Sequence, residues 1–315
     1  MSMQFQTNNQ QSNNTIMSTH PTPSHKSVLT EEVLEYLNLR PGKIYLDVTF
    51  GAGGHTRAIL EREPSCRVIA MDWDTQALDD FGVPLQAEFG DRLQLIWGNF
   101  SLLYKLLKKS GVKSVDGILA DFGTSQVQIT QRHGFSVYRD TPLDMRMSPS
   151  HQRITAAHIL ATATEEELRQ IFWQYGGEGY AKKIAYFIVT ERKTKPIETT
   201  VQLAKLVERA LPEKRHHRVH AATKVFQALR IFVNKELDNI SAFLASAVTS
   251  LNPEGRLVCI SFHSLEDRIV KQFFKDRALL GQLEIITPKV VTASEEELEA
   301  NPSARSACLR AAERV

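Results

Sequence analysis

The sequence predicts an α/β fold in which a mostly parallel sheet is interrupted by a helical insertion. Short apolar runs alternate with helical patterns, which is typical of a parallel sheet covered on both faces. The fourth and fifth runs are about 135 residues apart, which is too long for one crossover connection. The predicted strands lie at residues 44–48, 67–71, 93–97, 117–120 and 257–260.

Polar residues follow each predicted strand. In a parallel sheet the carboxyl ends of the strands meet at one edge, and ligands bind in the crevice beyond that edge. The sequence therefore predicts a binding site built from these residues. They are Gly51–Gly54, Asp72, Gly98–Asn99, Asp121 and Ser261–His263, in strand order.

The segment between the fourth and fifth strands reads as several helices. Thr164, which precedes three glutamates, and Thr199 are suitable residues for helix starts. After this segment, apolar residues recur at steps of three or four, so we expect one long helix that packs on the core and returns to the sheet. Its apolar stripe is Phe226, Leu229, Val233, Leu237, Ile240 and Leu244.

The composition excludes several classes of protein. The chain has 315 residues, 42% of them hydrophobic, which is enough for a buried core. No apolar run approaches 18 residues, so we expect no membrane-spanning helix. Three separated cysteines without a CxxC motif indicate a reducing compartment, and we expect a cytoplasmic protein. The first 24 residues carry no Asp, Glu, Lys or Arg, and we interpret them as a disordered polar tail.

The overall charge does not indicate nucleic-acid binding, but its distribution does. Lys and Arg number 38 against 36 Asp and Glu, a net charge of +2. Residues 182–195 and 209–224 each carry a net charge of +4. Such clusters are the expected footprint of phosphate binding, although a solvated basic face explains either of them alone. His216 and His220 have a spacing seen in zinc sites, but no third ligand is evident, so we predict no metal site.

The first glycine loop favours S-adenosylmethionine (SAM) over a dinucleotide. Gly51 and Gly53 follow a strand, but Thr56 stands where a dinucleotide fingerprint has its third glycine. Asp72 follows the next strand, where a carboxylate accepts hydrogen bonds from ribose hydroxyls. Asp47, just before the loop, would repel a pyrophosphate, whereas the ammonium and sulfonium of SAM tolerate it.

Several longer motifs are too specific for a generic fold. They extend from about His25 to Arg314 and resemble the MraW/RsmH family of ribosomal RNA small subunit methyltransferases. The motifs are HKSVL at 25–29, DVTFGAGGH at 47–55, GFS at 134–136, PLDMRM at 142–147, FQALRI at 226–231, VN at 233–234 and ISFHSLEDRIVK at 260–271.

The resemblance implies a reaction and a domain organisation. The reaction is the SAM-dependent transfer of a methyl group to N4 of a cytidine in 16S rRNA, in the P-site region of the decoding centre. The fold is a Rossmann-like SAM-dependent methyltransferase sheet with an inserted all-helical domain. We expect residues 25–135 and 216–315 to form the SAM-binding domain, and residues 136–215 to form a helical domain for RNA recognition.

The partners and the alternatives follow from the same resemblance. We expect the partner to be 16S rRNA within the small ribosomal subunit, with no membrane, and the sequence leaves a homodimer open. A SAM-dependent methyltransferase acting on another RNA or DNA amine is the alternative enzyme. A non-catalytic RNA-binding or ribosome-assembly factor that kept the fold is the alternative from another class.

The resemblance also implies the cofactor contacts. Glycines let the backbone approach the methionine part, the acid after the second strand accepts from the ribose, and a phenylalanine packs near the adenine. The matching residues are Gly53, Gly54, His55, Asp72, Phe100, Asp121 and Gln128.

Asp121 is our candidate catalytic residue. The N4 lone pair of cytosine is delocalised into the ring and is a poor nucleophile. We hypothesise that Asp121, or a nearby backbone carbonyl, accepts an N4 hydrogen and aligns the lone pair for in-line displacement. The target base must leave its stack, and Phe262 and His263 would then stack on it or simply form a packed turn.

The motif that contains His263 also has structural interpretations. We expect Ser264 to be a helix N-cap with an acid at N3, Asp267. A Ser-His-Asp hydrolase is a poor interpretation, because a GxSxG motif is absent. Four charged residues form an ion-pair network around the site or contact RNA phosphates; they are Asp144, Arg146, Glu266 and Arg268.

Overall fold

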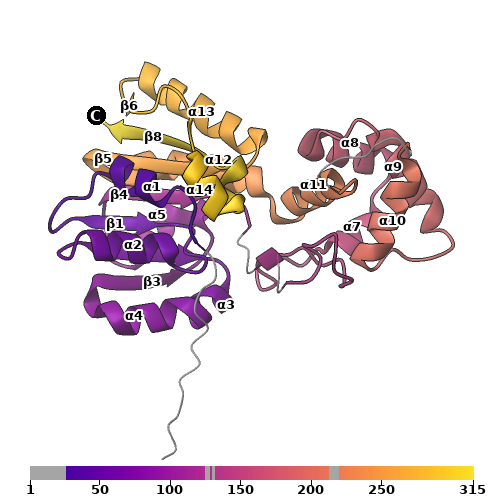
Figure 1. The fold of residues 1–315 in the computed structure, drawn as a ribbon, viewed down its shortest axis with the longest axis horizontal. Coiled ribbons are helices and arrows are strands. Elements are labelled where there is room, and N and C mark those ends of the chain that lie inside the picture. Colours follow the sequence, from indigo (N-terminus) through magenta and orange to yellow (C-terminus); the bar gives the residue numbers. More distant parts are fainter. Residues whose placement is uncertain (1–25, 125–127, 130–131, 213–219) are drawn as a thin grey trace, which may run out of the picture.

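The predicted α/β class with a helical insertion is confirmed. The computed structural model describes residues 26–124, 128–129, 132–212 and 220–315. It shows a sheet-containing α/β unit joined to a helical unit (Figure 1). The polar tail predicted at residues 1–24 lies outside the described residues. The strands are β1 (Ile44–Asp47), β2 (Arg67–Asp72), β3 (Leu93–Trp97), β4 (Val115–Asp121), β5 (Leu251–Ser261), β6 (Leu283–Ile285), β7 (Val291–Thr292) and β8 (Cys308–Arg314).

The five predicted strands form the parallel part of the sheet. The strand order is β3-β2-β1-β4-β5-β8-β6, and β7 pairs with β8. Strands β1 to β5 run parallel, whereas β8 is antiparallel to β5, β6 and β7. The order reverses between β1 and β4, and the crevice beyond such a reversal is where open α/β sheets bind ligands.

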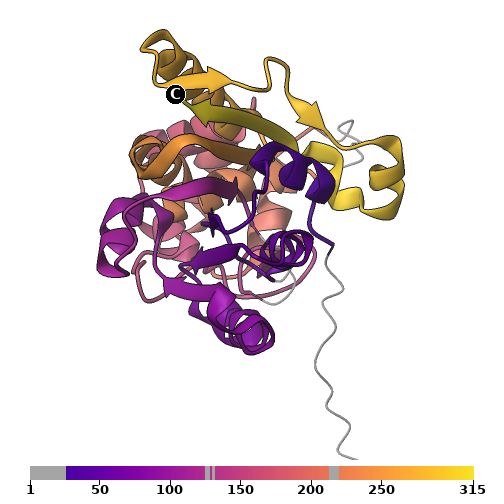
Figure 2. The same cartoon turned by 90° about the vertical axis from the view of Figure 1, so that its left-hand side faces the viewer.

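Helices cover both faces of the sheet (Figure 2). Successive residues of a strand point to opposite faces, so Tyr45 packs with α1, α2 and α4, whereas Leu46 packs with α5, α12 and α13. The helices of this unit are α1 (Thr30–Leu37), α2 (Gly54–Arg62), α3 (Thr75–Ala77), α4 (Val83–Phe89), α5 (Leu103–Lys109), α12 (Glu236–Ser250), α13 (Ser264–Leu279) and α14 (Glu295–Ala300).

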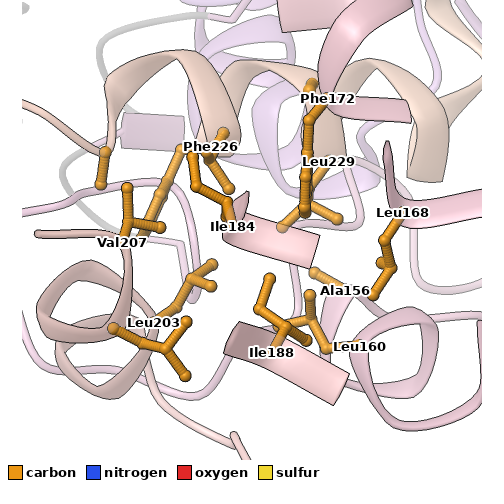
Figure 3. Close-up of a cluster of buried hydrophobic side chains, with 14 of the residues drawn as sticks. Ala156, Leu160, Leu168, Phe172, Ile184, Ile188, Leu203, Val207, Phe226 and Leu229 are labelled. Carbon is orange, nitrogen blue, oxygen red and sulfur yellow. The ribbon is translucent and has the colours of Figure 1, made fainter. Parts of the chain in front are cut away.

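The helical unit has its own hydrophobic core (Figure 3). The expected starts at Thr164 and Thr199 are confirmed, since both residues cap a helix in a capping box. None of the described helices is long and apolar enough to cross a membrane. The helices of this unit are α7 (Ala156–Thr162), α8 (Glu165–Gly176), α9 (Ala181–Glu191), α10 (Thr200–Ala210) and α11 (Thr223–Asn234).

The prediction of a single long helix over residues 226–244 is wrong, because two helices cover these residues. Lys235 adopts a left-handed conformation with φ of 51°, which ends α11 and starts α12. Phe226 and Leu229 belong to the helical core, whereas Leu244 packs against the sheet. The apolar spacing continues across the break, so the pattern hides it. The helical core extends through α11, beyond the boundary that we expected at residue 215.

Candidate active site

A cavity of about 720 Å³ lies at the carboxyl ends of β1 and β4. Its walls come from both units, because the loops after the strands face the start of α11 and the segment around Gly134. All the sequence-predicted cofactor residues line it except Gly53. The strand ends therefore bring these residues together, as the parallel arrangement predicts.

The turn after β1 has no room for side chains. Gly53 has φ of 80°, and a Cβ there would lie 2.7 Å from the Phe50 ring. A Cβ on Gly54 would lie 2.2 Å from the Ser27 hydroxyl oxygen. Gly53 lies behind the cavity wall and sets the turn, whereas Gly54 presents its backbone to the cavity.

Asp72 is a buried acceptor at the end of β2. Its Oδ2 accepts from the Gly51 N–H at 2.8 Å, and its Oδ1 accepts from the Asp74 N–H at 2.9 Å. Each carboxylate oxygen keeps a further lone pair for a ligand donor. Burial raises the pKa of Asp72 to about 7, although the two backbone N–H groups lower it. The protonation of this group therefore changes near neutral pH.

Asp47 lies behind the glycine turn and not in the cavity wall. Its side chain is 1% exposed and accepts from the Thr56 hydroxyl at 2.7 Å and from the Thr49 N–H at 3.1 Å. Burial raises the pKa of Asp47. This residue fixes the turn from behind, so its effect on a ligand acts through the turn and its charge.

His55 and Asp121 face each other across the cavity floor. The distance from His55 Nε2 to Asp121 Oδ2 is 3.6 Å. Both ring nitrogens of His55 and Oδ1 of Asp121 are buried without a hydrogen-bond partner among the described residues. Burial lowers the pKa of His55, but the carboxylates of Asp121 and Asp47 raise it more, so the net pKa is above its ordinary value. Unpaired buried polar atoms are rare, and here they indicate a ligand.

Phe100 forms an aromatic wall at the end of β3. Its ring lies 6.0 Å from the Phe122 ring and 5.6 Å from the Phe243 ring, between centroids. The contact with Phe243 is edge-on, at 75° between the ring planes. Such an arrangement holds the Phe100 ring still in the cavity wall, where a flat heterocycle can pack on it.

Gln128 contacts the loop after β2. Its amide nitrogen donates to Asp74 Oδ2 at 3.4 Å, and Arg132 forms an ion pair with the same aspartate. Gln128 lines the cavity and is 8% exposed. Asp74, whose side chain also caps the helix after β2, thus connects the two loops. Sequence reasoning missed this connection.

A partly buried network of charged and polar residues at the cavity was also missed as a unit. Arg230 donates from Nε and Nη2 to the two oxygens of Glu236, both at 2.9 Å, and from Nη1 to Thr124 at 3.1 Å. His263 Nε2 lies 3.2 Å from Glu266 Oε1. The FQALRI motif supplies the arginine, and the SFHSLEDR motif supplies the histidine and the second glutamate. A pairing across α11, α12 and α13 leaves no spacing signal in the sequence.

Three members of this network have side chains of the types that bind metals, and these side chains lie close together. Glu236, His263 and Glu266 each place a donor atom within 4.8 Å of the others. However, His263 Nδ1 accepts from the Glu266 N–H at 3.4 Å, so we assign the ring proton to Nε2, which then has no lone pair for a metal. Arg230 also occupies both oxygens of Glu236. The Arg230–Glu236 ion pair and the hydrogen-bonded tautomer of His263 therefore do not favour a metal centre, although His263 Nε2 and Glu266 Oε1 have no hydrogen-bond partner among the described residues.

The N-cap expected at Ser264 is wrong by one residue. His263 caps α13, since Nδ1 accepts from the Glu266 N–H and Glu266 Oε2 accepts from the N–H groups of Phe262 and His263. A histidine ring nitrogen accepts a hydrogen bond as a serine hydroxyl does, and serine is the commoner cap. Asp267 pairs instead with Arg310, at 2.6 Å.

The predicted four-residue network divides into separate parts. Asp144 and Arg146 pair with each other, and the Asp144–Arg146 contact is 2.6 Å. Glu266 belongs to the network at α13, and Arg268 is exposed. Asn234 of α11 explains much of the PLDMRM motif, because it accepts from the Met147 N–H at 2.8 Å and donates to the Met145 carbonyl at 2.7 Å.

The basic windows are partly structural. Arg192 donates to two carbonyls at the end of α7, both at 2.7 Å, and Lys224 donates to the Gly177 carbonyl at 3.1 Å. Arg209 pairs with Glu191 at 3.2 Å. The zinc spacing falls partly on residues 213–219, which lie outside the described residues. The exposed lysines of the first window are Lys182, Lys183, Lys193 and Lys195.

The sheet order and the acidic strand ends define a Rossmann-like SAM-dependent methyltransferase fold. The sequence matches the MraW methylase family over residues 22–315, and the chain belongs to this family. Two similar curated proteins are both named ribosomal RNA small subunit methyltransferase H. The one from Desulfotalea psychrophila is 49% identical over 294 residues, covering 92% of this chain and 98% of its own. The one from a Cyanothece species is 49% identical over 292 residues, covering 92% and 95%.

A solved structure is also similar. TrmN from Thermus thermophilus aligns with a TM-score of 0.44 and 13% identity, covering 91% of this chain and 48% of that one. The predicted family membership is confirmed by the family match and the curated relatives.

Proposed function

We propose that this methyltransferase transfers a methyl group from SAM to N4 of a cytidine in 16S rRNA, in the P-site region of the decoding centre. The names of its relatives support a small-subunit rRNA substrate. The observation that carries the proposed chemistry is the pair of Asp121 and His55. In the described part of the chain, their buried polar atoms Asp121 Oδ1, His55 Nδ1 and His55 Nε2 have no hydrogen-bond partner, and both residues line one cavity with the predicted cofactor residues.

The cavity residues fit SAM. Asp72 has lone pairs to accept hydrogen bonds from the ribose hydroxyls, and Phe100 offers a fixed aromatic surface to the adenine. Gly54 exposes its backbone where a side chain would collide with Ser27. Gln128 stands beside the loop that follows Asp72. SAM supplies an electrophilic methyl group on a positively charged sulfur.

Asp121 has the chemistry to orient the target amine. Its Oδ1 is a hydrogen-bond acceptor that has no partner among the described residues, so it can accept one N4–H of cytosine and direct the lone pair at the methyl carbon. Alignment of this kind contributes much of the barrier reduction in two-reactant steps. The amine then loses a proton, and in this proposal the carboxylate of Asp121 accepts it. His55 is a positioning residue, because its Nε2 faces Asp121 Oδ2.

RNA recognition involves the helical unit in this proposal. The exposed lysines of α9 and of the segment after it provide positive charge for the phosphates. Phe262 lines the cavity and lies against Gly123, so it is available to the target base. We further propose that the enzyme acts in the cytoplasm on the small ribosomal subunit, either as a monomer or as a homodimer.

Mass spectrometry of rRNA nucleosides from a deletion strain tests this function. We expect N4-methylcytidine in 16S rRNA to disappear and to return with the wild-type gene. Unaltered N4-methylcytidine would contradict the proposal. Isothermal titration with SAM separates an enzyme from a non-catalytic assembly factor, which would not bind the cofactor.

A variant of Asp121 tests the mechanism. Asp121→Asn keeps the shape of the side chain but removes the charge, and we expect the single-turnover rate at saturating SAM to fall about 100-fold or more. Wild-type protein measured at the same SAM saturation is the control. A full single-turnover rate in Asp121→Asn would refute the catalytic role.

A further inference from the structure

We propose that Tyr138 and Arg305 form a clamp for the RNA strand at the cavity mouth. In this proposal, which rests on the proposed RNA methylation, Tyr138 stacks on a base next to the target nucleotide and Arg305 pairs with a phosphate of the same strand. Both residues line the cavity, yet neither belongs to its buried floor. No motif in the sequence pointed to either of them as a contact with RNA bases.

Tyr138 is an open aromatic surface beside a cavity. Its side chain is 77% exposed, which is unusual for an aromatic residue that lines a pocket. It contacts the ring of His220 edge-on, with centroids 5.5 Å apart and the planes at 89°. Such a contact uses at most one face of the tyrosine ring, so the described residues leave the other face free for a flat ligand.

The neighbour of Tyr138 is held in place. His220 Nδ1 accepts from the Ala222 N–H at 3.1 Å, and His220 Nε2 lies 3.2 Å from Glu208. The histidine ring therefore supports the tyrosine ring from a fixed position. A preorganised ring loses little conformational entropy when it binds, which favours stacking.

Arg305 reaches the same cavity from the α/β unit. It lies in a 3₁₀ helix, Pro302–Ser306, that contacts α14 and β7. Its side chain is exposed, and the described part of the chain provides no ion pair for its guanidinium. A guanidinium with no ion pair among the described residues and an open aromatic ring line one cavity, and the two groups match the phosphate and the base of a nucleotide.

Base flipping explains why the clamp belongs at this position. A base that enters the cavity leaves its stack, so each flanking base loses a stacking partner. An aromatic side chain at the mouth replaces that partner, and stacking on a side chain tolerates any base. The two halves of the clamp come from the two units, so a strand that contacts both must cross the cavity.

Because Tyr138 and Arg305 are exposed, we expect substitutions of these residues to leave the fold intact. We expect Tyr138→Ala to raise the KM for small ribosomal subunits lacking the modification about tenfold, with a much smaller change in kcat. Tyr138→Phe keeps the ring and should behave like wild type. The matched control is Tyr104→Ala on α5, because Tyr104 is 58% exposed and does not line the cavity.

Salt dependence tests Arg305. One lost phosphate contact lowers the slope of log affinity against log salt by about 0.7 for a single strand. We expect that change in Arg305→Ala, measured by anisotropy with a single-stranded RNA of the target sequence. Lys108→Ala, an exposed lysine of α5 that does not line the cavity, should leave the slope unchanged.

A fluorescent base reports the stacking directly. With 2-aminopurine next to the target cytidine, we expect quenching by wild type and Tyr138→Phe and recovery of the signal with Tyr138→Ala. If both clamp variants match their controls in KM, in salt slope and in quenching, the clamp is overturned while methylation stands. If wild type binds and quenches the RNA but forms no N4-methylcytidine, the proposed function fails and the clamp stands.

Discussion

The affinity for the cofactor is expected to depend on pH through Asp72. Burial raises the pKa of this carboxyl to about 7. Ribose hydroxyls that donate to the carboxylate favour its charged form, so its pKa is lower in the complex. Binding therefore releases a proton at acidic pH, and affinity rises with pH until the empty site is fully ionised.

The size of the effect follows from the fraction ionised. With a pKa of about 7, about one tenth of the empty protein carries the charged form at pH 6 and about nine tenths at pH 8. The Kd is thus expected to be about eight- to tenfold higher at pH 6 than at pH 8. Above pH 8 the Kd should become constant.

Isothermal titration with S-adenosylhomocysteine measures this dependence and avoids a second effect. The pKa of His55 is also raised, so a protonated histidine would repel the positive sulfur of SAM at low pH. S-adenosylhomocysteine lacks that charge but has the same ribose. A Kd that stays constant from pH 6 to pH 8, or a slope that persists in Asp72→Asn, would refute the assignment to Asp72.

The stability of the protein without cofactor should change with pH in the opposite direction to the cofactor affinity. A carboxyl whose pKa is higher in the folded protein favours folding when protonated, and this contribution is lost progressively as pH rises from its ordinary pKa near 4 to about 7. The Tm of the wild type minus that of Asp72→Asn should therefore fall between pH 5 and pH 7 and become constant by about pH 8. A difference that rises with pH would contradict the raised pKa.

Two further variants test the packing around the cavity. Gly53→Ala forces a methyl group against Phe50, so we expect SAM affinity to fall more than tenfold. The control is Gly111→Ala, because Gly111 also has a positive φ, 79°, but has open space around it. This control should cost only about 1–2 kcal/mol of stability and leave SAM binding intact. If both variants lost SAM affinity equally, the positive φ would explain the loss and the contact with Phe50 would not. Asn234→Ala leaves two buried backbone groups unpaired, and we expect the free energy of unfolding by urea to fall by about 2–4 kcal/mol. Ser241→Ala, on an exposed face of α12, should change it by less than about 0.5 kcal/mol, and a similar loss in both variants would contradict this reasoning.

The parts of the site that lie on parallel strands could be predicted from the sequence. Asp72 and Asp121 each follow a short apolar run, and parallel strands bring such residues to one edge whatever the details of packing. The helix starts at Thr164 and Thr199 were equally predictable, since capping depends on a few neighbouring residues.

Features that depend on the orientation of whole helices could not be predicted. The pairing of Arg230 with Glu236 requires the chain to turn at Lys235, and a lysine with positive φ has no sequence signal. His263 replaces the expected Ser264 as the cap, because the backbone of His263 is extended and its Nδ1 accepts from the Glu266 N–H. The antiparallel strand β8 was missed for a similar reason, since its short apolar segment gains its pairing only from β5 and β6.

The turn between α11 and α12 explains how two separate cores can share one cavity. The stripe on α11 packs into the helical unit, and the stripe on α12 packs against the sheet, so the turn at Lys235 is where the two units meet. Arg230 and Glu236 form a bidentate pair across it, and Asn234 bonds to the backbone of the segment that enters the helical unit. Bidentate and buried polar contacts fix direction more strictly than apolar packing does. The helical unit is therefore held in one orientation at the cavity that Asp121 lines, which an enzyme needs if the RNA bound to one unit is to present its base to the other.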